Sequence, residues 1–178
     1  MIQAEKSGTT STYLQDPYDR RIKKSVGGVV TWYLWDGTKP LSEYNSAGTR
    51  TKRYAYLGDD LAPTLVEDAA GPYSLHADHL QTPRLLTNSA AQIVWGARYP
   101  AYGNAVLQQN PDGNGTAITL NLRFPGQYFD GETGLHQNHF RDYDPAIGRY
   151  VQSDPIGLVG GINPMSMLTT TRSDFSIR

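Results

Sequence analysis

Apolar and polar residues alternate over short stretches of the chain, and no long stretch has helical spacing. Examples of the alternating stretches are residues 21–24 (RIKK), 30–33 (VTWY) and 44–48 (YNSAG). A period of two is typical of β-strands with one buried face, whereas no window keeps apolar residues at i, i+3, i+4 and i+7. The pattern therefore predicts a mainly β protein of short strands and turns.

A four-residue motif, Tyr-x-x-Asp, recurs along the first third of the chain. It reads YLQD at 13–16, YLWD at 33–36 and YLGD at 56–59, with offsets of 20 and 23 residues. Asp, Asn and Gly follow the apolar positions, so each repeat predicts a strand, a turn and a second strand. A period of about 20 residues is typical of arrays in which each hairpin buries its face against the next.

Composition supports this picture and removes several kinds of chemistry. The 178 residues include 18 Gly, 11 Pro and 12 Tyr, which favour strands and turns, and the chain is long enough for a sizeable core. There is no cysteine, which excludes disulfides, thiolate metal sites and a cysteine nucleophile. The formal net charge of −1 gives no reason to expect nucleic acid or an anionic membrane as a partner.

No apolar run is long enough to span a bilayer, and the first residues lack the basic and apolar regions of a secretory signal. We therefore expect a protein that is cytoplasmic as synthesised.

Two aspartates stand out in the stretch RDYDPAIGRYVQSDPIG, which covers residues 141–157. Asp144 and Asp154 are each followed by Pro and, shortly afterwards, by Gly. Asp hydrogen bonds to backbone two residues on, Pro fixes φ, and Gly accepts positive φ, so such a sequence favours a turn. For Asp144 we interpret the motif as a turn only.

Longer stretches resemble the Rhs (YD-repeat) proteins. They are the Tyr-x-x-Asp hairpins, HADHLQTPR at 76–84, and FPGQYFDGETGLHQNHFRDYDPAIGRYVQSDPIGLVGGIN at 124–163, so that the resemblance covers roughly residues 11–163. It implies a hollow β-shell of YD hairpins wound in a spiral around a C-terminal toxin, closed at one end by a repeat-associated core segment.

The resemblance also implies a division of the chain. We expect an N-terminal tail at 1–10, YD-repeat β-hairpins at 11–107 and a flexible polar loop at 108–116. The irregular Rhs repeat-associated core segment follows at 117–164, and a divergent tail at 165–178 completes the chain.

The same resemblance gives Asp154 a possible catalytic role. In many Rhs proteins two Asp-Pro-x-Gly motifs supply an aspartyl-protease-like pair that cleaves the chain after the second motif. Two carboxyl groups held close together cannot both ionise, so one can act as acid and the other as base. Residues 154–157 match the first motif, but the second is absent, and the nearest acid, Asp174, is followed by Phe. We therefore expect Asp154 to be vestigial, with Asp174 as the candidate partner, and self-cleavage to be lost.

Histidines and aromatic residues offer two alternative sites. His76 and His79 flank Asp78, while His136 and His139 form a second pair, and together they could ligate a metal if the pairs met in space. On a strand, residues three apart point to opposite faces, so the interpretation that we prefer is structural, without metal or other cofactor. An exposed aromatic row could bind carbohydrate, although cross-strand packing is the simpler role for these residues: Trp32, Tyr33, Trp35, Tyr54, Tyr56 and Trp95.

Together these observations predict a structural shell fragment of an Rhs-type polymorphic toxin, of the kind used in interbacterial competition, without a toxin domain. The alternatives are a residual self-cleaving core and a carbohydrate- or metal-binding β module. The expected partners are upstream shell segments or further copies of the chain, joined through exposed strand edges, and neither nucleic acid nor a membrane span is expected. Complete family members are exported or delivered by specialised secretion.

Overall fold

The structure is a computed structural model that describes residues 2–6, 8–155, 157 and 165. The mainly β prediction is confirmed: the described residues form fifteen strands and no α-helix. The strands of the first sheet are β1 (Ile2–Lys6), β2 (Thr9–Gln15), β3 (Arg21–Val26), β4 (Val29–Asp36), β5 (Lys39–Tyr44), β6 (Arg50–Ala55), β7 (Leu65–Asp68), β8 (Gly71–Ala77), β9 (Pro83–Thr87), β10 (Ile93–Arg98) and β11 (Val106–Gln108). A second sheet contains β12 (Tyr128–Asp130), β13 (Leu135–Asn138), β14 (Arg141–Asp144) and β15 (Arg149–Tyr150).

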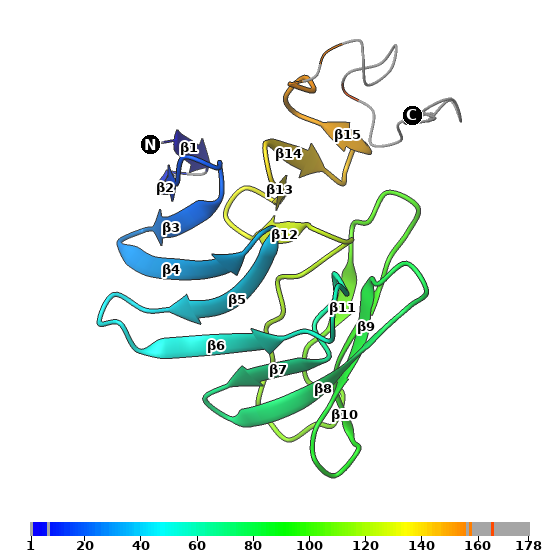
Figure 1. The fold of residues 1–178 in the computed structure, drawn as a ribbon. Coiled ribbons are helices and arrows are strands. Elements are labelled where there is room, and N and C mark those ends of the chain that lie inside the picture. The colour runs from blue at the N-terminus through cyan, green and yellow to red at the C-terminus, as the bar shows by residue number, and fades with distance from the viewer. Residues whose placement is uncertain (1, 7, 156, 158–164, 166–178) are drawn as a thin grey trace.

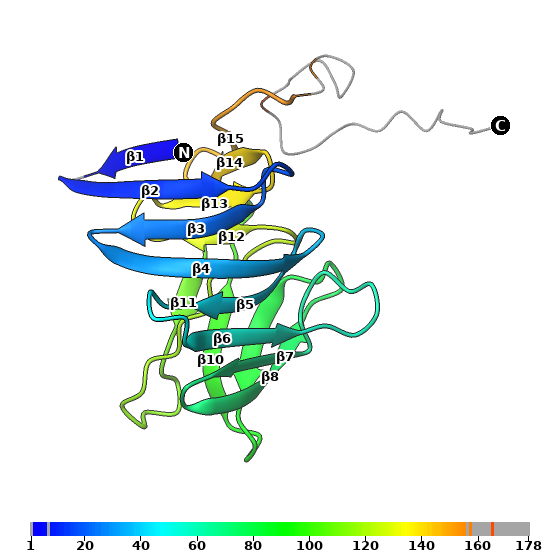
Figure 2. The same ribbon diagram turned by 60° about the vertical axis from the view of Figure 1, so that its left-hand side comes forward.

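Both sheets are antiparallel meanders in which each strand pairs with the next one along the chain. The first has the order β1 to β11 and the second the order β12 to β15. Most connections between strands are short turns, and a tight turn brings each strand back antiparallel beside its predecessor, which explains this order. The eleven-stranded sheet twists and curls, and the smaller sheet lies beside its first hairpins (Figures 1 and 2).

The first residues do not form the predicted N-terminal tail. Ile2–Lys6 pairs antiparallel with β2 over five residue positions. The sequence of this strand, IQAEK, is too polar and too short to predict a buried face. It still forms a strand because an edge strand is held chiefly by its backbone hydrogen bonds. Within the described residues, the hairpin array therefore includes Ile2–Lys6.

A buried tyrosine recurs on alternate strands and defines the structural repeat. Tyr13, Tyr33, Tyr54 and Tyr73 lie on β2, β4, β6 and β8, and each is at most 7% exposed. Their offsets of 20, 21 and 19 residues are more regular than those of the Tyr-x-x-Asp motif. In the third motif Tyr56 follows the end of β6 and is only partly buried, so Tyr54 is the structural equivalent.

The irregular segment between β11 and β12 covers the inner face of the curled sheet. Figure 1 shows it crossing the hollow of the sheet, and its residues Ile118, Leu120 and Leu122 are at most 8% exposed. They join one hydrophobic cluster with inward side chains of the hairpins, among them Leu86 and Trp95, which are fully buried. Because the inward side chains in this cluster are apolar, the segment completes a core that the sheet alone would leave open to water.

Candidate functional site

A buried ionic cluster joins the two sheets. Arg21 on β3 donates to both carboxylate oxygens of Asp130 on β12, at 2.6 Å each. Lys24 Nζ lies 2.9 Å from Asp130 Oδ1 and 3.3 Å from Glu132 Oε2. The hydroxyl of Tyr13 donates to Glu132 Oε1 at 2.8 Å. Two cations therefore meet two carboxylates where β12 and the turn after it contact the first hairpins.

The cluster is shielded from water, and this strengthens its interactions. The side chains of Arg21 and Asp130 are 7% and 3% exposed. Burial alone would lower the pKa of Arg21, but the attraction of the Asp130 carboxylate and its hydrogen bond raise it. Burial, the charge of Asp130 and the bond to Glu132 raise the pKa of Tyr13, which stays a hydroxyl donor. The cluster therefore clamps β3 to β12 through a buried, hydrogen-bonded ion pair.

Sequence reasoning missed this cluster because it depends on a bulge. In a regular strand, residues three apart such as Arg21 and Lys24 point to opposite faces. The register between β2 and β3 shifts where Leu14 pairs with Lys23 and Gln15 with Arg21, which leaves Ile22 as the extra residue. The bulge brings both cations to Asp130.

A second buried carboxylate, Glu43 on β5, holds the start of β12, which follows the covering segment. It accepts hydrogen bonds from Tyr54 at 2.6 Å and from Tyr128 at 2.9 Å. Burial and the charge of Glu43 raise the pKa of both tyrosines well above the usual value, so both donate. This arrangement links β5, β6 and β12 inside the core.

His136 on β13 is buried in its neutral form. Its Nδ1 lies 2.7 Å from Gln127 Oε1, and the ring packs at 5.6 Å from Phe129 and 6.0 Å from Tyr143. Burial and the nearby Arg123 guanidinium lower its pKa to about 4, against the attraction of Asp130 and Asp144. The second sheet thus contains a core histidine that resists protonation.

The turn interpretation of Asp144 is confirmed. Its side chain accepts from the Ala146 amide at 2.9 Å, and its carbonyl accepts from the Gly148 amide at 2.9 Å. Gly148 has φ +69, and a Cβ there would lie 2.6 Å from the Tyr102 ring, so this position requires glycine.

Asp154 also lies at a turn and is held by an arginine. Its carbonyl accepts from the Gly157 amide at 2.9 Å, and its carboxylate lies 3.0 Å from Arg141 Nη1. The Arg141 guanidinium in turn stacks over Tyr150 at 3.7 Å from the ring centre. Asp174, the partner considered for Asp154, lies outside the described residues. The expected loss of self-cleavage therefore stays a prediction that the structure does not test.

The structure does not bring the two histidine pairs together. His76 lies on β8 and contacts Thr87 Oγ1, His79 lies in the β8–β9 turn, and Asp78 is paired with Arg84 at 2.7 Å. His136 is buried on β13, whereas His139 follows that strand with φ +53. Within the described ranges, no three His, Asp or Glu side chains form a group that could hold a metal ion.

Of the six aromatic residues considered for a binding row, all but Trp32 belong to the core or pack against it, as the packing interpretation predicts. Tyr33, Tyr54 and Trp95 are buried, and Trp35 and Tyr56 pack against them. Trp32 points to the outer face of β4, is 39% exposed and has Lys23 Nζ 5.0 Å from its ring centre. One partly covered indole does not make a row of aromatic rings.

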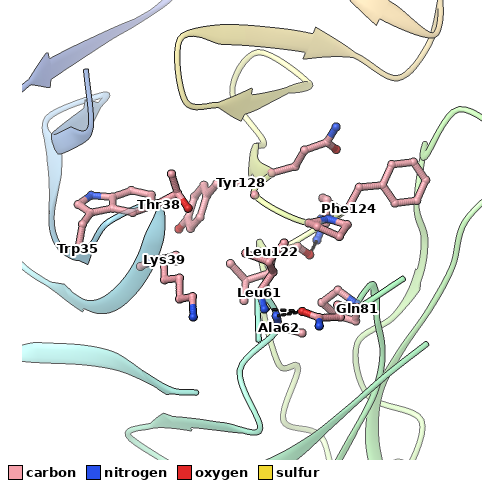
Figure 3. A pocket seen from close by; sticks show the side chains of 15 residues that line it. Trp35, Thr38, Lys39, Leu61, Ala62, Gln81, Leu122, Phe124 and Tyr128 are labelled. Atoms are coloured by element: carbon pink, nitrogen blue, oxygen red, sulfur yellow. Dashed lines mark hydrogen bonds between the residues drawn. The ribbon is translucent and has the colours of Figure 1, made fainter. Parts of the chain in front are cut away.

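A cleft lies where the loop before β7, the β8–β9 turn and the turn at 124–126 converge (Figure 3). In it the side-chain oxygen Oε1 of Gln81 accepts from the backbone amides of Leu61 and Ala62, and Trp35 and Tyr128 line the opposite wall. The space open to the centre of a water molecule is about 20 Å³. That volume holds a water molecule rather than a substrate.

Comparison with known proteins identifies the family. A family model described as the Teneurin YD-shell matches residues 1–160. The double-stranded DNA deaminase toxin A of Burkholderia cenocepacia is 30% identical over 177 residues, 85% of this chain and 12% of that protein. The probable deoxyribonuclease RhsA of Dickeya dadantii is 31% identical over 166 residues, 87% of this chain and 11% of that protein. This chain therefore spans about a tenth of the length of these relatives.

Solved structures show the same fold. The crystal structure of TcdB2-TccC3 without its hypervariable C-terminal region superposes with a TM-score of 0.66 at 20% identity, covering 93% of this chain and 9% of that one. The described part of the chain contains no helix with the length and hydropathy needed to cross a membrane. The curled hairpin sheet, the covering segment and the family match agree: the chain belongs to the Teneurin YD-shell family and is an Rhs (YD-repeat) protein.

Proposed function

We propose that this chain works as a shell segment of an Rhs-type polymorphic toxin, a scaffold that extends by strand pairing rather than a toxin itself. Its relatives include the toxin protein Tse5 of Pseudomonas aeruginosa, which is 42% identical over 89 residues, half of this chain and 6% of that protein. The described residues contain a core, two clamps and one covered inner face. Shell segments of the same hairpins are the partners that such a sheet would take.

The observation that carries the proposal is the edge of the sheet at β1. The order of the sheet gives β1 one neighbour, β2, so its other side presents backbone amides and carbonyls without a strand partner in the described sheet. Thr10 on β2 lies opposite Glu5 on β1. The carbonyl of Thr10 accepts from the amide of Gly27, so the backbone groups of Thr10 point away from β1. Glu5 therefore occupies a non-hydrogen-bonded pair, and its amide points outward, as does that of Gln3 two residues earlier. An added antiparallel strand would bond to these groups.

The test removes one outward donor and leaves the inward ladder in place. Glu5→Pro keeps the pairs at Ala4 and Lys6 but lacks the amide that an added strand needs. Glu5→Ala is the matched control, because it removes the same carboxylate and keeps the amide. We expect sedimentation velocity to show concentration-dependent assembly of the wild type and of Glu5→Ala, with weaker assembly of Glu5→Pro. A strictly monomeric wild type, or equal assembly of all three proteins, would contradict the proposal.

A further inference from the structure

The polar loop that follows β11 has regularly spaced side-chain oxygens. It reads NPDGNGT and places oxygen-bearing side chains at every second position: Asn110, Asp112 and Asn114. Gly115 follows at once, and Thr116 ends the stretch. In calcium-binding loops the first, third and fifth residues offer side-chain oxygens, the sixth is glycine and the seventh offers its backbone carbonyl. The motif is short, so the spacing by itself does not make a site.

The structure folds this stretch into a closed loop. The amide of Ile118 donates to the carbonyl of Gln109 at 2.7 Å, which fixes the two ends. Ile118 is 4% exposed and belongs to the hydrophobic core, so the loop is anchored where it ends. Gly113 and Gly115 have φ of +69 and +85, a region that glycine enters without strain and that lets the chain turn sharply at both positions.

Two oxygens of the loop are shielded from solvent and have no hydrogen-bond partner within the described residues: Asn110 Oδ1 and Asp112 Oδ1. The third side chain of the series contacts its neighbours, because Asn114 Nδ2 donates to Asp112 Oδ2 at 2.8 Å and Asn114 Oδ1 accepts from the Thr116 amide at 2.7 Å. Acceptor oxygens that are removed from water without a donor are costly. Two of them at alternate positions of one loop point to a shared electropositive ligand.

The surroundings of the loop are negatively charged. Burial and then the charges of Asp68 and Asp112 raise the pKa of Tyr73 on β8, so both carboxylates lie close enough to act on one hydroxyl. The ion pairs of the described residues include neither Asp68 nor Asp112. Lys52 lies opposite Asp68 in the β6–β7 pair, but its ammonium donates to the carbonyl of Thr119. A cation at the loop therefore meets carboxylates that no basic side chain of the described residues has neutralised.

We propose that this loop is a calcium site. Its ligands are the side-chain oxygens of Asn110, Asp112 and Asn114 and the backbone carbonyl of Thr116, and water completes the roughly six to eight oxygens that Ca²⁺ takes. Amide and carbonyl oxygens supply most of this set, so a cluster of His, Asp and Glu alone does not reveal it.

The low charge of the loop makes the site a weak one. Asp112 is its one carboxylate, and the twelfth position, where calcium-binding loops have a bidentate glutamate, is Asn121. Because affinity follows the number of charged ligands, we expect a Kd of about 1 mM, in the range of extracellular calcium modules. The bound ion ties the last strand of the large sheet to the segment that covers its inner face, a role separate from the strand edge at β1.

Titration of the ¹⁵N-labelled chain with calcium chloride tests the site, with the amide signals of Gly113 and Gly115 as reporters. We expect these signals to shift saturably with a Kd of about 1 mM for Ca²⁺, and more weakly for Mg²⁺, which is smaller and gives up its water reluctantly. Asp112→Asn removes the carboxylate and keeps the shape of the side chain, so it is expected to weaken Ca²⁺ binding at least about tenfold. Asp36→Asn is the matched control, because Asp36 is exposed and also precedes a glycine.

The outcomes are distinct for this site and for the proposed function. Saturable shifts at the loop in the wild type and in Asp36→Asn, with weakened binding in Asp112→Asn, support the calcium site. Loop signals that do not move up to about 20 mM Ca²⁺ overturn it, because a site of this class is then largely filled. Saturable shifts that Asp112→Asn leaves unchanged also overturn it, since the ion then binds elsewhere. The titration does not depend on assembly at β1, so its failure leaves the shell function standing.

Discussion

At the scale of single residues, Asp154 lies at a turn and His136 packs inside the second sheet. Asp154 has a turn amide on its carbonyl and an arginine 3.0 Å from its carboxylate. His136 is enclosed by Phe129, Tyr143 and the Gln127 amide. Two predictions follow from these environments, one for each residue.

The Asp154 environment predicts that the chain stays intact. Its ion pair with Arg141 supports a structural role, and the sequence lacks the second Asp-Pro-x-Gly motif. Intact mass spectrometry of freshly purified protein is expected to give one full-length mass for the wild type and one for Asp154→Asn. A cut near the C-terminus in the wild type alone would show that Asp154 keeps its chemistry.

Burial of neutral His136 predicts that the protein loses stability as the pH falls. The folded pKa of about 4 lies below the ordinary 6.5, so the unfolded chain binds the proton first. Stability is then full above pH 6.5 and declines as the pH drops toward 4, by about 2 kcal/mol between pH 7 and pH 5. Urea unfolding of the wild type and His136→Gln at both pH values measures the difference. Identical pH slopes for the two proteins would refute the assignment.

At the scale of elements, the structure depends on how turns and bulges place side chains and on how the second sheet is clamped to the first. The turn after β9 has Ala91 at φ +59, where the equivalent position after β5 is Gly48. The clamp at Asp130 joins β3 to β12 through two cations. Each feature yields a substitution with an expected sign.

Ala91→Gly is expected to stabilise the protein. A left-handed backbone costs an L-residue about 1–2 kcal/mol, and glycine avoids most of that cost, partly offset by its greater freedom when unfolded. Ala90→Gly, one residue earlier in the same exposed turn, is the control and is expected to destabilise slightly. Thermal and urea unfolding should therefore move in opposite directions for the two variants, and a loss of stability in Ala91→Gly would contradict the turn geometry.

Asp130→Asn is expected to destabilise the protein by about 3–5 kcal/mol, because it leaves Arg21 and Lys24 without their shared buried carboxylate. Glu67→Gln provides the contrast, since its ion pair with Arg53 spans 3.3 Å but both side chains are more than 30% exposed. That exposed pair is expected to contribute less than about 1 kcal/mol. Equal losses in urea unfolding would show that the cluster does not clamp the two sheets.

At the scale of the whole molecule, the sequence predicted the hairpin array and its family. It did not predict that the segment between β11 and β12 covers the inner face of the sheet. Alternating residues and tyrosines about 20 residues apart were enough to indicate sequential hairpins, because strand pairing of neighbours needs only local turns. The path of Ile118–Tyr128 across the inner face could not be predicted in this way, since it depends on contacts between residues far apart in the chain. The Arg21–Asp130 contact, 109 residues apart, is an example.

The candidate site was less predictable than the fold. The sequence indicated Asp154 as a catalytic candidate and four histidines as metal-ligand candidates, because carboxylates and imidazoles can take these roles. The groups that organise the molecule, Asp130 and Glu43, are carboxylates in ordinary strand contexts. Asp130 is buried beside Arg21, and Glu43 is buried beside Tyr128. The β-bulge that brings Arg21 to Asp130 cannot be recognised from the alternation of apolar and polar residues.

The central claim is that the sheet extends at β1, and residue-resolved hydrogen exchange tests it most directly. The amides of Gln3 and Glu5 point outward, whereas that of Ala4 faces β2. We expect Ala4 to be protected in dilute and concentrated samples alike, and Gln3 and Glu5 to gain protection only on assembly. If the chain assembles while Gln3 and Glu5 still exchange as fast as in the dilute monomer, β1 is not the edge by which the shell grows.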